Sequence, residues 1–359
     1  MKHEIMKTLL LMILALLLPL QIEARKRELG KARKVVRGFS AIDTSYIEPQ
    51  HYNFTVMLQS TFNYDFYRLA SSNGDYVDLS PDVIMRVGPY VGWRWFFLGY
   101  TFELKNLGVS EGKLKKEFNF YIYSSQIGID LFYRRTGSDY KIRNAGFGPN
   151  VNANRLEGVA FDGVNVGITG INTYYIFNHN RFSYPAAFSQ STCQKISCGS
   201  WIAGLGYTRN SLEFDSKKLE ALVQDRCDIP SFEVDSGMKF NKVNYWDVSL
   251  SGGYAYNWVF ARNCLFCASA QLALAYKRSH GNTESNSSSQ GFQFNNINLD
   301  GIGRFGIVYN NTRWYAGASA ILHTNNYRKE RFETYNVFGC LNIYTGYNFG
   351  IKPRYRKKK

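Results

Sequence analysis

The pattern in this sequence that most resembles a reactive or metal-binding motif is formed by its cysteines. There are six: Cys193, Cys198, Cys227, Cys264, Cys267 and Cys340. Cys264 and Cys267 have the CxxC spacing of thiol–disulfide exchange sites and zinc knuckles. A second CxxC is missing, and Cys193 and Cys198 are spaced more widely than zinc ligands usually are. The favoured interpretation is therefore one or two structural disulfides, or small apolar filler residues. No metal or cofactor is predicted.

Ser319 and His323 are the second pair of residues that could do chemistry, namely the hydrolysis or transfer of a lipid acyl chain. They share one face of an expected strand. Four residues along a strand span roughly 13 Å, which is too far for the hydrogen bond that activates a serine. A lipid enzyme is therefore the third interpretation of the function, and the protein is predicted not to be an enzyme.

A larger set of polar side chains is expected to point inward from the strands of a barrel. The set contains Arg86, Glu103, Gln126, Asp130, Asp247, Gln271, Lys277, Arg304, Asn342 and Asn348. Charges of both signs inside a barrel of about twelve strands can line a narrow aqueous path, or they can pair across the barrel and fill it. Barrels of about eight strands are filled and those of about sixteen are open, so both interpretations stand.

The strand pattern that positions these side chains is clearest in residues 118–135, FNFYIYSSQIGIDLFYRR. The odd-numbered positions are mostly apolar, with tyrosines at both ends: Tyr121, Tyr123, Ile127, Ile129, Leu131 and Tyr133. The even-numbered positions between them are polar or small: Ser124, Gln126, Gly128 and Asp130. Because strand side chains alternate between two faces, this stretch predicts one strand that crosses a bilayer with aromatic rings at each headgroup region.

Eleven strands are expected from the same alternation, at residues 52–62, 83–91, 94–104, 118–135, 164–177, 201–208, 246–256, 266–277, 305–309, 314–322 and 337–349. Bacterial single-chain barrels have an even number of strands, so twelve is the predicted number, with the twelfth strand expected in 150–163 or 182–194. Loops are expected at 63–82, 105–117, 136–163, 209–244, 278–296 and 324–335. Short turns at 259–264 and at Asn310-Asn311 are placed on the periplasmic side, and the loops at 209–244, 278–296 and 324–335 outside.

The two ends of the chain hold most of its positive charge. Residues 1–24 have the cationic start, apolar run and small final residue of a signal peptide. The linker 25–42 and the tail 351–359 each contribute +6 to a net charge of +15, which leaves +3 for the predicted barrel, 43–350. The basic ends are expected to be solvated arms, or alternatively to bind anionic lipid or cell wall in the periplasm. No nucleic-acid motif is present, so nucleic acid is not an expected partner.

Several longer motifs resemble a known family. DTSYIEP, YNFTVMLQ, LSPDVIMRVGPYVGWRWFFLGYTFEL and NHNRFSYPAAFSQSTCQ are similar to an uncharacterised family of outer-membrane proteins from Bacteroides-like Gram-negative bacteria, domain of unknown function 4421. The resemblance extends over residues 43–349. It implies an outer-membrane β-barrel and supplies no substrate or catalytic residue. Such barrels end on an aromatic residue that the barrel assembly machinery reads, and Phe349 fits this role although ten residues follow it.

The sequence therefore predicts an all-β protein, a transmembrane antiparallel up-and-down β-barrel of about twelve strands in the cell outer membrane. The leading functional hypothesis is a narrow channel or transporter for small polar or anionic solutes. The alternative is a non-conducting structural or adaptor barrel that binds periplasmic or surface partners. The expected partners in either case are outer-membrane lipid and the barrel assembly machinery.

Overall fold

The computed structural model describes residues 42–93, 96–99, 102–103, 116–136, 139–280, 297–329 and 332–356. The predicted signal peptide, the linker up to residue 41, most of the polar loop at 105–117 and the last three residues of the tail lie outside this described part. Residues 42–359 form one compact unit.

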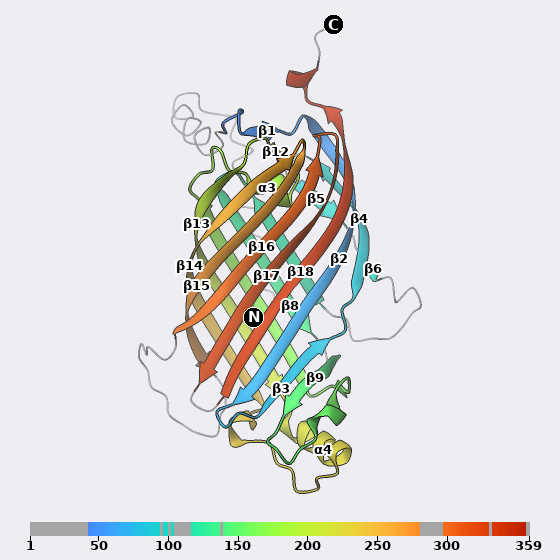
Figure 1. The fold of residues 1–359 in the computed structure, drawn as a ribbon, viewed down its shortest axis with the longest axis vertical. Coiled ribbons are helices and arrows are strands. Elements are labelled where there is room, and N and C mark those ends of the chain that lie inside the picture. The colour runs from blue at the N-terminus through green and yellow to red at the C-terminus, as the bar shows by residue number, and fades with distance from the viewer. Residues whose placement is uncertain are drawn as a thin grey trace, which may run out of the picture. The chain divides into compact units, whose positions relative to one another are not determined.

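Twelve strands of the described residues form an antiparallel up-and-down sheet (Figure 1). They are β2 (Tyr52–Ser71), β4 (Met85–Trp93), β5 (Phe96–Gly99) with β6 (Phe102–Glu103), β7 (Lys116–Tyr123), β8 (Ile127–Thr136), β11 (Val164–Ile176), β13 (Cys198–Phe214), β14 (Lys242–Ala261), β15 (Cys264–His280), β16 (Ile297–Asn310), β17 (Trp314–Lys329) and β18 (Phe332–Ile351). We count β5 and β6 as one strand because both follow one register against β4.

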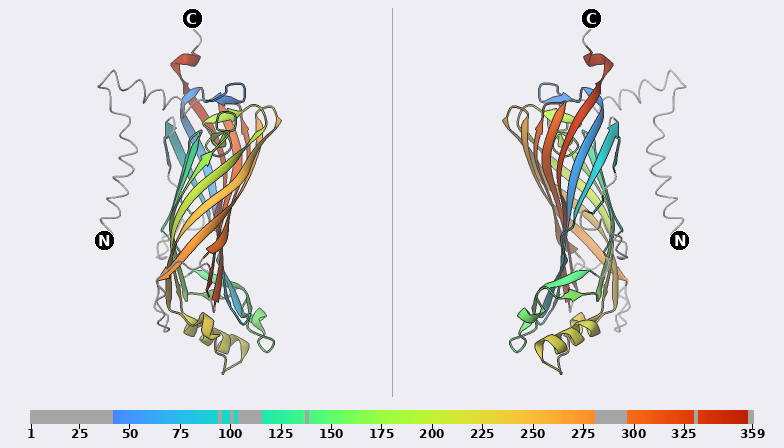
Figure 2. Two further views of the ribbon diagram at one scale, coloured as in Figure 1. Left: turned by 90° about the vertical axis from the view of Figure 1, so that its left-hand side faces the viewer. Right: turned by 90° about the vertical axis from the view of Figure 1, so that its right-hand side faces the viewer.

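The sheet curves round so that the last strand returns to the first. β18 pairs with β2 along almost the whole length of both strands (Figures 1 and 2). Among the twelve barrel strands, the two edges are β7 and the strand formed by β5 and β6, while β3 (Tyr76–Pro81), β9 (Tyr140–Gly146) and β10 (Ala160–Phe161) extend the sheet from β2 as a separate branch. Among the described residues no ladder joins these edges, and residues 104–115 between them lie outside the described part. The fold is the predicted β-barrel, and the described residues supply the predicted twelve strands of its wall.

No helix among the described residues is long and apolar enough to cross a membrane.

The exterior of the sheet carries an apolar band. On β14 the outward side chains Val248, Leu250, Tyr254 and Trp258 are 44–61% exposed. From Val248 to Trp258 the strand covers about 33 Å, or about 23 Å of height at a 45° tilt. This height matches the ~25 Å apolar band of an outer-membrane barrel, so the band faces lipid.

One end of the barrel, which we call the turn end, holds the short connections and the C-terminal end of β18. Residues 262–263 join β14 to β15 and residues 311–313 join β16 to β17, as predicted. Asn263 and Thr312 take left-handed backbone conformations in these turns. Four exposed tryptophans near this end form an aromatic belt: Trp93, Trp201, Trp258 and Trp314.

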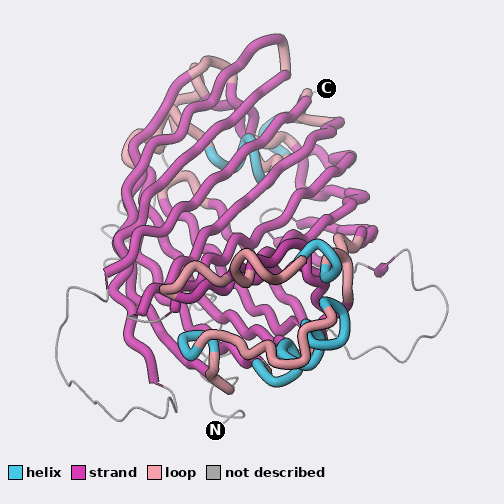
Figure 3. The backbone as a smooth tube through the Cα atoms, turned by 60° about the horizontal axis from the view of Figure 1, so that its bottom comes forward, coloured by secondary structure: helices cyan, strands magenta, loops and turns pink. Residues whose placement is uncertain are grey.

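The opposite end, the module end, carries a small folded module. It contains β3 (Tyr76–Pro81), β9 (Tyr140–Gly146), β10 (Ala160–Phe161) and α4 (Ser216–Cys227), with short 3-10 helices at Ala153–Leu156 and Ser236–Met238 (Figures 1 and 3). Asp215 caps α4 by accepting a hydrogen bond from the backbone N–H of Lys218 at 3.1 Å. Leu219 and Val223 then lie one turn apart and are fully buried against the barrel end.

The structure corrects the prediction of a single strand at 118–135. Residues 124–126 form a turn, and the stretch is a hairpin of β7 and β8. Tyr121 pairs with Asp130 across the hairpin, and paired residues point to the same face, so both face the interior. Tyr123 likewise stacks on Phe188 inside the barrel, with ring centroids 5.6 Å apart. The predicted lipid-facing tyrosines of this first half are thus interior residues.

The hairpin also supplies the twelfth strand, so the two expected locations for that strand are wrong. Residues 150–163 contain a 3-10 helix and β10, and 182–194 contain α3 (Tyr184–Phe188) and β12 (Thr192–Gln194). Several expected loops are strands as well, because β2, β13, β15, β17 and β18 continue well beyond the apolar band. The predicted loops at 63–82, 136–163, 209–244 and 324–335 are therefore largely ordered, whereas residues 281–296 lie outside the described part.

The lipid-facing band makes a direct prediction about stability. Leu272 is 64% exposed on β15, near the middle of the band. We expect Leu272→Lys to lower the free energy of unfolding in lipid vesicles by about 2–4 kcal/mol, because a cation at the bilayer midplane loses its hydration. Ala221→Lys on the exposed face of α4 is the matched control and should change stability by less than about 0.5 kcal/mol. Equal effects of the two substitutions in a urea titration would show that the band does not face lipid.

Candidate functional site

The predicted inward polar residues whose side chains are described point into the barrel, as the alternation predicts. Asp130, Asp247, Gln271, Lys277 and Arg304 are at most 3% exposed, and Gln126 is 9% exposed. Arg86 is half-buried, and Glu103, its register partner on β6, lies where side chains are outside the described part. Whether these residues line a solute path remains a prediction, since burial alone identifies an interior position and not a route.

Arg304 and Asp130 form an ion pair across the interior of the barrel. Both side chains are fully buried. Arg304 belongs to β16 and Asp130 to β8, and four strands separate these two in the sheet, so the contact bridges the lumen and not a neighbouring pair. The side-chain amide of Asn172 donates to Asp130 at 3.4 Å, and the Arg304 guanidinium lies 4.7 Å from the ring centroid of Tyr174.

A second buried cation lies nearer the module end. The Lys277 ammonium is fully buried, 2.9 Å from the Asp300 carboxylate, and donates to the side-chain carbonyl of Asn325 at 2.5 Å. Asp247 is the register partner of Lys277 and accepts a hydrogen bond from Asn210 at 3.4 Å. This cluster therefore joins β13 to β17.

Arg134 is a third buried cation, and it was not among the predicted site residues. Its guanidinium donates to the backbone carbonyls of Tyr64 at 3.2 Å and Gly339 at 3.0 Å, and so joins β8 to β2 and β18. The sequence could have identified Arg134 as an inward residue, because it lies four positions after Asp130 on the same strand and so points to the same face.

His323 and Ser319 do not form a catalytic pair in this arrangement. Both are buried and point inward, as predicted. The His323 ring packs between the rings of Phe132 and Phe338, with centroids 5.6 Å and 5.2 Å away. Within the described residues no hydrogen bond reaches the His323 ring, so Ser319 lacks the base contact that nucleophilic catalysis needs.

The barrel interior at the module end is filled by an apolar core. Side chains from strands on different sides of the barrel meet there, among them Tyr67 of β2, Val166 of β11, Tyr245 of β14 and Phe338 of β18. The rings of Tyr245 and Tyr327 stack with centroids 4.7 Å apart. Loop and helix residues of the module complete the same core.

The turn end is filled by the segment 178–197, which connects β11 to β13 and folds back into the barrel. We call it the plug. Ser183 caps its helix α3, because the Ser183 hydroxyl accepts a hydrogen bond from the backbone N–H of Ala186, and Pro185 occupies the first turn. Tyr184, Ala186 and Ala187 are at most 2% exposed.

Hydrogen bonds attach the plug to several strands. The hydroxyls of Tyr184 and Ser269 share a bond of 2.5 Å. The Asn257 amide donates to the Ser183 carbonyl at 2.9 Å and to Gln194 at 3.0 Å. Gln190 donates to the hydroxyl of Tyr344 at 2.8 Å. The plug is therefore bonded to β14, β15 and β18.

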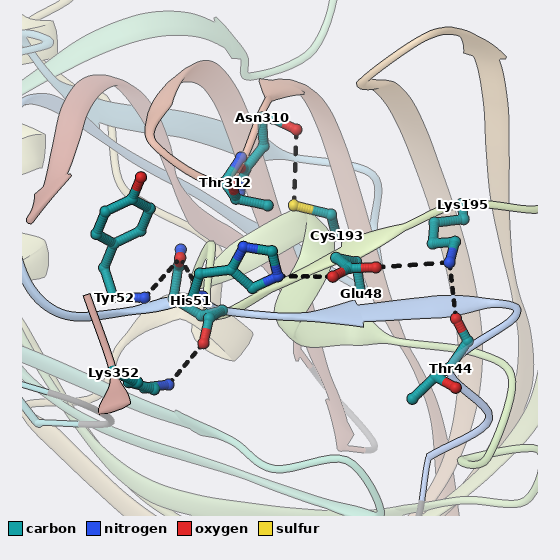
Figure 4. Close-up of polar contacts among 10 residues, drawn as sticks. Thr44, Glu48, His51, Tyr52, Cys193, Lys195, Asn310, Thr312 and Lys352 are labelled. Carbon is teal, nitrogen blue, oxygen red and sulfur yellow. Dashed lines mark hydrogen bonds and ion pairs between the residues drawn. The ribbon is translucent and has the colours of Figure 1, made fainter. Parts of the chain in front are cut away.

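A cavity of about 300 Å³ lies beside the plug at the turn end. β1 (Ile47–Pro49) pairs with β12 to cover one side of it, and the two turns 262–263 and 311–313 form the other. Figure 4 shows the polar groups around it: Glu48 accepts from His51 at 2.6 Å, and Lys195 lies 3.5 Å from Glu48 and donates to the Thr44 carbonyl at 2.8 Å. Sequence periodicity missed this site because its residues lie in turns and in the plug.

Cys193 lies in the wall of this cavity, where its thiol donates to the Asn310 carbonyl at 3.6 Å (Figure 4). Burial raises the pKa of the Cys193 thiol to about 12. The thiol is therefore protonated at neutral pH and is a poor nucleophile.

All six cysteines are free thiols, so the expected disulfides are not formed. Cys264 and Cys267 lie on one strand at positions of opposite parity: Cys267 is buried inside the barrel, whereas Cys264 is half-exposed beside the turn. Their side chains point to opposite faces and cannot act together as a CxxC site. The interpretation as small filler residues fits Cys267 and Cys340, which are 0% and 5% exposed.

Comparison with known proteins gives a family and distant structural likenesses. Residues 41–349 match the family described as domain of unknown function DUF4421. No curated protein matches the chain.

Three solved structures illustrate the structural likenesses. The outer membrane protease OmpT of Escherichia coli is 9% identical, with a TM-score of 0.33, and the alignment covers 86% of this chain and 100% of OmpT. The NalP translocator domain of Neisseria meningitidis is 9% identical, with a TM-score of 0.29 and coverage of 89% and 96%. The toluene transporter TodX of Pseudomonas putida is 8% identical, with a TM-score of 0.23 and coverage of 84% and 91%.

The buried ion pair of this interior makes a testable prediction. We expect Asp130→Leu alone to destabilise the folded barrel by about 3–5 kcal/mol, because the Arg304 guanidinium is left buried without its counter-charge. The double variant Asp130→Leu/Arg304→Met should recover most of that loss, since it removes both charges and keeps the volume. Unfolding free energies in lipid vesicles measure the coupling. Additive effects of the two single substitutions would contradict a direct contact.

Proposed function

This chain belongs to the DUF4421 family, and we propose that it is a non-conducting outer-membrane barrel. It holds a folded module at the cell surface and its basic linker and tail in the periplasm. The observation that carries this proposal is an interior filled at three successive levels. The apolar core fills the module end, the buried ion pairs fill the middle, and the plug fills the turn end.

Complete burial of the charged side chains is the decisive detail. Arg304, Asp130 and Lys277 have no solvent-accessible side-chain surface, so water does not reach them through the lumen in this conformation. Parting a buried ion pair costs about 3–5 kcal/mol because each charge is then left uncompensated. A continuous path needs the separation of both pairs, the displacement of the plug and an opening in the apolar core.

The orientation follows from the lengths of the connections. Bacterial outer-membrane barrels place short turns in the periplasm and longer connections outside. The turn end is therefore assigned to the periplasm and the module end to the cell surface. The basic linker and tail then both lie in the periplasm, where anionic lipid or cell wall is their proposed partner.

Deleting both the linker and the tail should reduce retention of the protein on anionic vesicles or on cell wall; unchanged retention on both would contradict this role.

A narrow channel or transporter for a small polar or anionic solute is the second candidate. The observation that favours it is a set of buried polar atoms that have no hydrogen-bond partner: Nε and Nη1 of Arg304, Oδ1 of Asp130 and Nε2 of Gln271. Buried polar atoms usually bind at least one water when protein supplies no partner. A hydrated interior of this kind would become a path if the plug, the ion pairs and the apolar core all moved apart.

Planar-bilayer recording separates the two candidates. We expect refolded, heat-modifiable wild-type protein to give no discrete conductance steps, because the plug and the ion pairs close the lumen. The variants Asp130→Asn and Arg304→Gln are recorded beside it. Discrete steps in the wild type, with an ion selectivity that either variant alters, would contradict the filled barrel and support the channel.

A further inference from the structure

We infer that the cavity at the turn end binds the free C-terminal carboxylate of a peptide presented from the periplasm. The inference rests on the proposed function for its orientation alone, since the same cavity is present whether or not the barrel conducts. Its volume of about 300 Å³ is at the lower end of ligand pockets, which suits one small end group and not an extended ligand.

The cavity offers donors that the protein itself does not use. Among the described residues, no ion pair or hydrogen bond involves the side chains of Arg262, Asn263 or the hydroxyl of Thr312, and all three residues line the cavity. Arg262 is exposed at its rim. A guanidinium binds a carboxylate through two parallel hydrogen bonds, so an unpaired arginine beside amide and hydroxyl donors suits that group.

The charge of the whole turn end favours an anion. Seven basic side chains lie there among the described residues, against the two acidic residues Asp43 and Glu48, for a net charge of +5. The seven are Arg181, Lys195, Arg262, Arg313, Lys352, Arg354 and Arg356. Each carboxylate already has a cationic neighbour: Asp43 lies 3.7 Å from Arg181, and Glu48 lies 3.5 Å from Lys195 (Figure 4). The field of this end therefore attracts anions from the periplasm.

Part of the cavity wall is apolar, since Ala186, Val259, Leu265 and Val308 are among the residues that line it. Leu265 and Val308 are inward residues of β15 and β16, 4% and 2% exposed, so the cavity lies within the mouth of the barrel and not on its lipid-facing exterior. A lipid headgroup stays outside the barrel wall, whereas a peptide end can enter from water. The apolar wall then takes the last side chain of the peptide.

Calorimetric titration of the full chain in zwitterionic nanodiscs tests the assignment. The probes are the tripeptide Ala-Ala-Val with a free C-terminus and the same peptide with a C-terminal amide. We expect the free acid to bind the wild type and the amide to bind at least roughly tenfold more weakly, because a charge-assisted hydrogen bond is lost. Arg262→Gln should weaken binding of the free acid by a similar factor.

Arg354→Gln is the matched control, because Arg354 is an exposed arginine of the same end that does not line the cavity. It should leave the affinity within about twofold of the wild type. Equal affinity for acid and amide, or unchanged affinity of Arg262→Gln, would overturn the assignment. Loss of co-purified anionic lipid from Arg262→Gln without any peptide effect would identify a lipid headgroup site and also overturn it. The nanodisc titration needs only a folded barrel, so its result is independent of the conductance recording.

Discussion

The burial of charge inside a barrel that spans a membrane is the constraint on which the rest of this structure depends. An unpaired ion in such a place is strongly destabilising, so each cation must find an anion or several dipoles. Arg304 finds Asp130 across the lumen, and Lys277 finds Asp300. Because Arg304 and Asp130 lie on strands that are not neighbours, satisfying their charges also draws opposite walls of the barrel together. Lys277 and Asp300 join the neighbouring strands β15 and β16. The plug and the apolar core can then pack against a closed middle layer.

The alternation of side chains made much of the fold predictable. It placed Asp247 of β14 and Gln271 and Lys277 of β15 inside the barrel, because only one of the two faces of each strand collects the polar residues. It failed at 118–135 for a physical reason. The turn Ser124-Ser125-Gln126 contains no glycine, proline or asparagine that would mark it in the sequence. The odd-numbered positions before and after it are mostly apolar, so the sequence looks like one continuous alternating strand. In the hairpin the facing of odd residues reverses, so Tyr121 points inward while Ile129 points outward.

The interior was predictable only in part. Sequence parity placed Asp130, Lys277 and Arg304 inside, but their partners depend on how far the strands are staggered around the barrel, which a single sequence does not encode. The plug was not predictable as structure, because 178–197 has neither a two-residue nor a helical period. Its motif NHNRFSYPAAFSQSTCQ nevertheless supported the family resemblance. The cavity beside the plug forms where the turns and the plug meet in space. The alternation of side chains along the strands therefore does not predict it.

Water access to the native interior cysteines tests the filled barrel most directly. Cys267 and Cys340 are free thiols that face the lumen from β15 and β18. The account predicts that a small, charged, water-soluble methanethiosulfonate reagent leaves both unmodified in folded protein in lipid bilayers, while the unfolded chain reacts fully, as read by peptide mass spectrometry. Half-exposed Cys264 reports whether the reagent reaches the turn end. Rapid modification of Cys267 and Cys340 in the folded state would contradict the account and reveal a water-filled lumen.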